Sequence, residues 1–480
     1  MEEKKTAVEK KEISLLWALT PLLVMVAVMI VTIVYLEQGP HIPLIIGTAV
    51  AALVAWKHGF KWNDIEEMMY KGIKLALPAV VIIILVGLII GAWIGGGVIA
   101  TMIYFGLKII TPAFFLVTIC VICMIVSLAI GSSWSTMGTV GVAGMGIGLS
   151  MGIPAPIIAG AVISGAYFGD KMSPLSDTTN LAAGLTGTGL FVHIKHMLYT
   201  TVPGIIIALT VYGILGTKYK ASNLDQGSIQ DTILMLEKSF VISPWLLLIP
   251  VALIALVVMK VPAVPALVVG FILGTLAQVF VQGGSLAEAI GALQSGYVIE
   301  SGNAMVDDLF NRGGLDSMMY TVSMTLVAMT FGGILEFSGM LQSIMNQILK
   351  LAKSAGTLVA STIVACFTTN ATCSEQYISI VVPARMFSTA YTKMGLHSKN
   401  LSRALEDGGT LTSVFIPWNT CGVFILGTLG VGAFEYAPYA VLNYVVPLLS
   451  IGYAMTGFTI QKLTQADIAE INKREASLES

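Results

Sequence analysis

Residues 169–184 read Gly169-Asp-Lys-Met-Ser-Pro-Leu-Ser-Asp-Thr-Thr-Asn-Leu-Ala-Ala-Gly184, a polar stretch in a chain that is apolar on both sides of it. A carboxylate at the centre of a bilayer costs roughly 2.5–3.5 kcal/mol, so such groups face a cavity, a partner or an ion. Pro174 removes a backbone N–H and breaks a helix. Broken helices expose backbone carbonyls that can coordinate cations within a membrane. The stretch therefore predicts an ion site at a break in a membrane-embedded helix.

The composition of the 480-residue chain indicates a membrane protein with several spans. Apolar residues make up 56% of the chain and charged residues 11%, and the mean hydropathy is +0.86. The apolar run Leu15–Leu36 matches the roughly 20 residues that cross a bilayer and is longer than a signal-peptide core of about 7–15 residues. Basic residues lie at the ends of apolar segments rather than in a patch, so no nucleic-acid partner is expected. We expect an all-α polytopic protein in the lipid bilayer of the cell membrane.

The second half of the sequence weakly repeats the first. Gly91-Ala-Trp-Ile-Gly-Gly-Gly97 aligns with Gly333-Ile-Leu-Glu-Phe-Ser-Gly339, and Pro174-Leu-Ser-Asp177 aligns with Pro417-Trp-Asn-Thr420. The matches occur in the same order in both halves, which chance does not readily produce. Internal repeats of this kind are typical of secondary transporters.

The charge pattern predicts that the two halves run in opposite directions across the membrane. The segment 57–74, interpreted as a loop with a short helix-like stretch from about Trp62, contains four lysines. Its counterpart 283–317, with a similar stretch from about Leu286, is acidic apart from Arg312. Cytoplasmic loops are enriched in Lys and Arg, so the first segment is placed inside and the second outside. We therefore predict two inverted-topology repeats, each with about five transmembrane helices, a re-entrant hairpin and a broken helix. The predicted parts are a cytoplasmic tail 1–13, repeat one 14–217 with its hairpin at 113–150, an extracytoplasmic linker 218–242, repeat two 243–460 with its hairpin at 356–392, and a cytoplasmic tail 461–480.

Four polar elements interrupt the apolar segments, two in each half. In the first half, 131–139 lies at the hairpin tip and 169–184 breaks the next helix; in the second half, 368–375 and 406–422 take the same places. Non-helical backbone at this depth must be buried in protein or line water, so we expect the tips to face the breaks around one site. The candidate transport and ion-binding residues are Ser132, Ser133, Ser135, Thr136, Asp170, Ser173, Ser176, Asp177, Thr178, Thr179, Asn180, Asn370, Thr372, Glu375, Asp407, Thr412, Asn419 and Thr420, with Lys171 as a charge partner.

Structural roles are the alternative for several residues of the first half. The hydroxyls at 132–136 also suit helices that approach closely and hydrogen-bond to each other. Asp170 and Lys171 are alternatively a buried structural ion pair. Asp177 has no adjacent cation in the sequence, which favours a role as an ion ligand or proton carrier.

Structural roles also compete for the acidic residues of the second half. Glu375 and Arg385 lie in one segment, and a salt bridge that holds the hairpin is the simpler interpretation. Glu406 and Asp407 are interpreted as the start of a helix, where acidic side chains are favourable without any function.

The stretches 131–141 and 169–182, together with Gly91-Ala-Trp-Ile94, closely resemble the NhaC family of sodium/proton antiporters. The resemblance extends over nearly the whole chain, and Ser173-Pro-Leu-Ser-Asp-Thr-Thr-Asn180 is its most specific part. It implies an ion-transporter architecture of inverted repeats with two re-entrant hairpins, and a homodimer with scaffold and transport domains. Some members resemble this sequence yet exchange malate and a proton for lactate and sodium, so both reactions stay open.

We expect a secondary active transporter that exchanges Na⁺ for H⁺ by alternating access. Either cation neutralises a buried carboxylate, so the two compete for the same oxygens, and a bare carboxylate is costly to move through a dry barrier. Asp177 is the expected carboxylate, and the expected sodium ligands are Ser133, Asp177, Thr178 and Asn180.

Three other functions are alternatives to this one. In an organic-acid exchanger, Thr412, Asn419 and Thr420 of the second half would bind a carboxylate. An ion channel would need a continuous pore without coupling. Sequence motifs for zinc hydrolases, nucleophile-elbow serine enzymes and P-loop ATPases are absent, so neither an enzyme nor a cofactor is expected, and Na⁺ is the transported ion.

Overall fold

The computed structural model describes residues 13–36, 38–219, 226–259, 261–300, 307 and 310–464. The predicted N-terminal tail up to residue 12, residues 220–225 of the predicted linker, and the predicted C-terminal tail from residue 465 lie outside these ranges. Throughout the described residues the chain is helical, apart from turns and one isolated bridge between Leu396 and Lys462.

The helices of the first half are α1 (Leu15–Ile30), η1 (Val31–Tyr35), α2 (His41–Lys57), α3 (Trp62–Gly95), α4 (Val98–Ile109), α5 (Pro112–Ile130), α6 (Ser133–Thr136), η2 (Met137–Gly141), α7 (Val142–Ser150), α8 (Ala155–Met172), α9 (Asp177–Leu185) and α10 (Leu190–Thr217). Those of the second half are α11 (Gln226–Ser239), η3 (Pro244–Leu247), α12 (Leu248–Val258), α13 (Ala263–Phe280), α14 (Leu286–Ser295), α16 (Gly314–Phe337), α17 (Met340–Leu349), α18 (Ala355–Cys373), α19 (Gln376–Lys393), α20 (Ser398–Leu405), η4 (Glu406–Thr410), η5 (Ser413–Phe415), α21 (Thr420–Leu429), α22 (Ala433–Tyr436) and α23 (Val441–Thr456).

The predicted class, an all-helical polytopic membrane protein, is confirmed. Among the described residues, seven helices are long and apolar enough to cross a bilayer, or up to nine if each of two bent helix pairs forms one span. One bent pair, Ser398–Phe415 with Thr420–Leu429, turns by 49° at the second predicted helix break. The first predicted break lies between α8, which ends at Met172, and α9, which begins at Asp177.

The chain reverses direction at the first predicted hairpin. Helix α5 ends at Ile130, and the next residue, Gly131, has a φ of +76°, the left-handed conformation that glycine favours. Beyond the turn, Gly144 packs against Ile119 and Gly148 against Phe115, so α7 returns antiparallel to α5. In the second hairpin the chain turns between α18 and α19 at Ser374, which also has a positive φ, of 59°.

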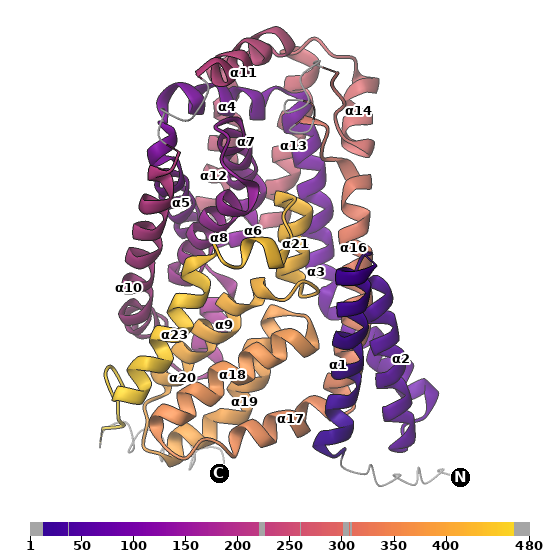
Figure 1. Cartoon of the computed structure of the whole chain (residues 1–480), viewed down its shortest axis with the longest axis vertical. Coiled ribbons are helices and arrows are strands. Elements are labelled where there is room, and N and C mark those ends of the chain that lie inside the picture. Colours follow the sequence, from indigo (N-terminus) through magenta and orange to yellow (C-terminus); the bar gives the residue numbers. More distant parts are fainter. Residues whose placement is uncertain are drawn as a thin grey trace.

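Different helices and helix ends lie at the two ends of the molecule (Figure 1). Helices α4, α11 and α14 lie at one end, whereas the start of α1, the end of α23 and helix α17 lie at the other. Buried apolar side chains form two clusters, one around α5, α7 and α8 and one around α17, α18 and α19. The two hairpins therefore have separate packed cores.

The segment 57–74 is mostly helical, so its interpretation as a loop was wrong, whereas the helix-like stretches expected from Trp62 and Leu286 are present. The turn ends at Lys61, and α3 begins at Trp62 and continues without interruption to Gly95. Asp64 accepts a hydrogen bond from the Lys61 N–H at 3.0 Å, and Glu67 pairs with Lys71 at 2.8 Å. Such first-turn and i,i+4 interactions stabilise a polar helical turn, and hydropathy does not detect them. The predicted linker 218–242 likewise contains a helix, α11.

Helices α3 and α16 approach each other closely at two glycines. A Cβ on Gly72 would lie 2.1 Å from the carbonyl oxygen of Met329, and one on Gly333 would lie 2.4 Å from that of Met68. Small residues allow backbones to approach in this way in membrane proteins. The contact joins the central helices of the two halves.

We predict that Gly72→Ala lowers the free energy of unfolding by about 1–3 kcal/mol, because the added methyl group meets backbone that cannot move aside. Thermal melting of purified protein in detergent measures the change. Gly452→Ala in α23 is the matched control, since its Cβ would meet nothing within 4 Å. Equal melting temperatures for the two variants would show that the α3–α16 contact is not tight.

Candidate functional site

Four helices begin inside the molecule, each at a polar N-cap. Ser132 caps α6, Ser176 caps α9, Glu375 caps α19 and Asn419 caps α21, and each side chain accepts a backbone N–H at 3.0 to 3.5 Å. The first N–H groups of a helix lack an intrahelical partner, and no water replaces that partner in the bilayer core. These polar residues therefore make the four interruptions possible.

Each hairpin tip contacts the helix break of its own half. A Cβ on Gly131 would lie 2.7 Å from the carbonyl carbon of Leu175 and 2.8 Å from the nitrogen of Ser176. In the second half, the backbone N–H of Thr420 donates to the carbonyl oxygen of Ser374 at 2.9 Å. The expectation that tips face breaks is met in both halves.

Asp170 links the first tip to the first break. One of its carboxylate oxygens accepts from the N–H and hydroxyl of Ser133, at 3.1 and 2.7 Å, and the other accepts from the Ser176 hydroxyl at 2.6 Å. All three residues are buried. Hydrogen bonds from three donors hold both oxygens of the Asp170 carboxyl group in place at the junction of hairpin and helix.

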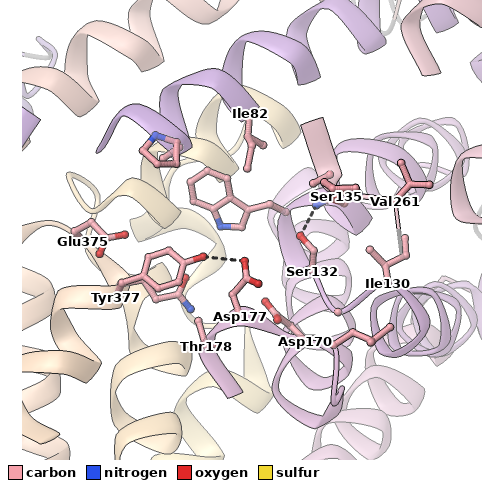
Figure 2. Close-up of a pocket in the computed structure, with 18 residues that line it drawn as sticks. Ile82, Ile130, Ser132, Ser135, Asp170, Asp177, Thr178, Val261, Glu375 and Tyr377 are labelled. Carbon is pink, nitrogen blue, oxygen red and sulfur yellow. Dashed lines mark hydrogen bonds between the residues drawn. The ribbon is translucent and has the colours of Figure 1, made fainter. Parts of the chain in front are cut away.

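A cavity of about 470 Å³ opens beside this junction. Its predicted polar lining residues are Ser132, Ser135, Asp170, Asp177, Thr178 and Glu375. Asp177 is exposed to the cavity, and its carboxylate lies opposite Tyr377, whose hydroxyl donates to it at 3.4 Å (Figure 2). Three carboxyl groups, those of Asp170, Asp177 and Glu375, and several hydroxyls therefore line one cavity.

The four expected sodium ligands do not all lie on this cavity. Asp177 and Thr178 line it, whereas Ser133 lies behind it and binds Asp170. The Asn180 amide group donates to the carbonyl oxygens of Pro174 and Ser176, at 2.9 and 2.7 Å, and so satisfies the backbone of the break. Asp170 is the carboxylate that binds the first hairpin, whereas Asp177 contacts Tyr377 of the second hairpin.

Several predicted residues use their side chains to satisfy nearby backbone. The hydroxyl of Thr136 donates to the Ser132 carbonyl, that of Thr179 to the Lys171 carbonyl and that of Thr372 to the Thr368 carbonyl, while Ser173 accepts from the N–H of Leu175. These contacts support the helix ends around the cavity.

The predicted polar residues of the second half form a separate cluster. The Asn370 amide donates to the Gly409 carbonyl at 2.8 Å and to the Thr412 hydroxyl at 3.1 Å. The Asn419 amide donates to the backbone and side-chain oxygens of Asn370, at 3.2 and 3.1 Å. Thr420 lies next to it at the start of α21. The second tip and the second break are thus linked by amides, where the first pair is linked by a carboxylate.

Lys171 pairs with Asp407 and not with Asp170, so the predicted ion pair between neighbours was wrong. The Lys171 ammonium lies 2.6 Å from an Asp407 oxygen, and both side chains are fully buried. Adjacent residues on a helix point in different directions and do not face each other. Asp407 also accepts from the Thr200 hydroxyl at 3.2 Å and lies 4.0 Å from Arg403. The pair joins the broken helices of the two halves.

The other acidic residues of the second half also differ from expectation. Glu375 caps α19 through the Ile378 N–H at 3.0 Å, and its carboxylate is not in a salt bridge with Arg385 within the described residues. Ten residues of α-helix span about 15 Å, too far for that pair to meet. Glu406 is not at a helix start, because α20 begins at Ser398 and continues into the π-helical η4.

Sequence reasoning missed two residues of the site. Tyr377 contacts Asp177, and the Gln376 side chain lines the cavity with an amide nitrogen that has no partner among the described residues. Both directly follow Glu375, so their position at the start of a half-helix was the available signal.

Interrupted helices that meet around a polar cavity, in a helical protein with many spans, define a membrane transporter for an ion or a small solute. The chain belongs to the Na⁺/H⁺ antiporter family, whose sequence profile matches residues 165–458. It is similar to the Na(+)/H(+) antiporter NhaC of Alkalihalophilus pseudofirmus, with 40% identity over 440 residues that cover 92% of this chain and 95% of the relative.

Two proteins of Bacillus subtilis are also similar. The Na(+)/H(+) antiporter NhaC is 38% identical over 428 residues, which cover 89% of this chain and 94% of the relative. The Malate-2H(+)/Na(+)-lactate antiporter is 37% identical over 424 residues, which cover 88% of this chain and 91% of the relative. The resemblance inferred from the motifs is confirmed.

We predict that Lys171→Met costs about 3–5 kcal/mol of stability, because it leaves the buried Asp407 without its closest cation. Asp407→Asn in the same chain should recover part of the loss. Lys71→Met is the matched control, since its ion pair with Glu67 is on the surface and is worth about 1 kcal/mol or less. Thermal melting of the single and double variants provides the comparison, and additive losses would argue against the pair.

Proposed function

We propose that this protein is a secondary active transporter that exchanges Na⁺ for H⁺ across the cytoplasmic membrane by alternating access. The observation that carries the proposal is the cavity at the first helix break, where Asp170 and Asp177 lie among hydroxyl and backbone oxygens. Hard cations prefer such oxygen ligands. Because the chain belongs to a family of antiporters, it is a transporter rather than an enzyme, and Na⁺ and H⁺ are its cargo.

The coupling of sodium to proton movement follows from the negative charge of the cavity carboxylates. A proton or a sodium ion at the cavity neutralises the same carboxylate oxygens, so each displaces the other. The carrier changes face when the site is neutralised, because moving an uncompensated carboxylate through a dry region is costly. We assign sodium binding to Asp170, Asp177 and Thr178, with Ser133 and Ser176 positioning Asp170.

We also propose the inverted repeat. The order of a long helix, a short helix, a hairpin, a broken helix and a last helix occurs twice, as α3 to α10 and as α16 to α23. The short helices α4 and α17 lie at opposite ends of the molecule, as inversion requires (Figure 1). Lys57 and Lys61 lie just before α3, and the excess of positive charge inside then places both termini in the cytoplasm. We propose a homodimer on the family resemblance alone.

We predict that Asp177→Asn abolishes sodium-driven proton movement in proteoliposomes, because the amide keeps the size of the carboxylate but cannot be neutralised by a cation. A pH-sensitive dye inside the vesicles reports the exchange. Asp64→Asn, at the exposed start of α3, is the matched control. Exchange at the rate of the unaltered protein in Asp177→Asn would remove Asp177 from the mechanism.

Exchange of organic acids is the second candidate function. Two observations favour it: the similarity to the malate/lactate antiporter and a cavity of about 470 Å³, larger than one dehydrated ion needs. Gln376 lines the cavity, and its buried amide nitrogen, which has no hydrogen-bond partner among the described residues, is a donor suited to a carboxylate.

The two functions predict different responses to organic acids. For the sodium/proton antiporter, sodium-driven proton movement proceeds in full without malate or lactate. An absolute requirement for either acid, lost in Gln376→Leu, would instead establish the organic-acid exchanger.

A further inference from the structure

The Asp177 carboxylate has capacity for ligands that the Asp170 carboxyl group lacks. Both Asp170 oxygens already accept hydrogen bonds from serines of the first hairpin and the first break. Within the described residues, the Asp177 side chain makes one hydrogen bond, which it accepts from the Tyr377 hydroxyl at 3.4 Å (Figure 2). Hydrogen bonds between a hydroxyl and an oxygen are ordinarily about 2.7–2.8 Å long. The two oxygens are therefore near each other without being tightly bonded.

The half-helix α19 holds Tyr377 in this position. Tyr377 is the second residue of α19, and Glu375 caps that helix through the Ile378 N–H at 3.0 Å. The Tyr377 side chain lines the cavity, and the residue is 43% exposed. Its hydroxyl oxygen accepts no hydrogen bond from the residues that the structure describes, so both lone pairs are free for a ligand.

The first hairpin carries an aromatic residue at the equivalent position, with an apolar partner. Trp134 is the second residue of α6, and its ring stacks on Phe424 of α21 with centroids 4.3 Å apart and planes 13° apart. Each hairpin thus places an aromatic ring against the broken helix of the other half. The Trp134 contact joins two rings, whereas the Tyr377 contact has an oxygen on each side. The Tyr377 contact is therefore the one that a cation can join.

The distance between the Asp177 and Tyr377 oxygens suits a shared sodium ion. Hard cations prefer oxygen ligands, and calcium, an ion of nearly the same size as sodium, binds them at about 2.3–2.6 Å. Two oxygens that bind one such ion at about 2.4 Å and at right angles to each other lie about 3.4 Å apart. The carboxylate and hydroxyl oxygens already have this separation.

We propose that the Tyr377 hydroxyl is a sodium ligand together with Asp177, so that the bound ion joins the first helix break to the second hairpin. The inference rests on the proposed function and adds to its site a ligand from the second half. Without sodium, the hydroxyl donates its hydrogen to Asp177. With sodium, the hydrogen turns towards cavity water, and both oxygens bind the ion. Tyr377 stays neutral in both states, and sodium neutralises the charge of Asp177.

Equilibrium binding of labelled Na⁺ to the purified protein at one fixed pH tests the assignment. In Tyr377→Phe, the sodium dissociation constant should rise about tenfold or more, because an oxygen that contacts a charge is lost. A tyrosine that only donates a hydrogen bond would have the opposite effect. Its loss would destabilise the ion-free carboxylate, and the dissociation constant would fall. The direction of the change therefore separates a ligand from a hydrogen-bond donor.

Tyr70→Phe is the matched control for this measurement. The Tyr70 hydroxyl also donates to a carboxylate, that of Glu66, at 2.7 Å on the exposed surface of α3. Its removal should leave sodium binding unchanged. A sodium dissociation constant that is unchanged or lower in Tyr377→Phe would overturn the assignment of Tyr377.

A second measurement keeps the test decisive if Tyr377→Phe is less stable. A ligand that binds only the folded state raises the melting temperature according to its affinity. Added Na⁺ should therefore raise the melting temperature of Tyr377→Phe less than that of Tyr70→Phe, and an equal rise would contradict the inference. Sodium binding that Tyr377→Phe does not weaken rejects this inference alone. Absence of sodium binding by the unaltered protein would instead reject the proposed function.

Discussion

Backbone groups that leave a helix inside a membrane must find partners within the protein, and the whole structure meets this constraint. Four helical segments begin in the interior at Ser132, Ser176, Glu375 and Asn419, each of which accepts a backbone N–H. Without such caps, the freed groups would cost several kcal/mol each in hydrocarbon. Stability and ion binding therefore draw on the same side chains.

Buried charged side chains meet the same constraint as the backbone groups, because they also need partners within the protein. Asp170 is held by the first hairpin tip, and Lys171, the next residue, reaches across to Asp407 in the other half. Neighbouring positions on α8 thus face different partners, one belonging to the cavity and one to the contact between the halves. A change of charge at the cavity is consequently felt by the pair that joins the two broken helices, because screening in the buried interior is weak.

Much of the fold was predictable because its signals are local. Pro174 and the surrounding hydroxyls predicted the first helix break, and apolar arms around 131–139 predicted a turn there; both agree with the structure. Partners distant in sequence were not predictable. Lys171 and Asp407 form an ion pair only because tertiary packing brings α8 and η4 together. Likewise, no residue near Glu406 in the sequence showed that its carboxyl group would be buried without a hydrogen-bond partner among the described residues. The full length of helix α3 was not predicted, because hydropathy detects burial in lipid rather than helix formation.

In the proposed mechanism, sodium and protons compete for one charge-balanced site. Equilibrium binding of labelled Na⁺ to the purified protein across a pH series tests this competition, with released protons counted in weakly buffered solution. We expect each bound sodium to release protons, and the sodium dissociation constant to rise about tenfold for each unit of acidification below the relevant pKa. A dissociation constant independent of pH, with no proton released, would contradict it.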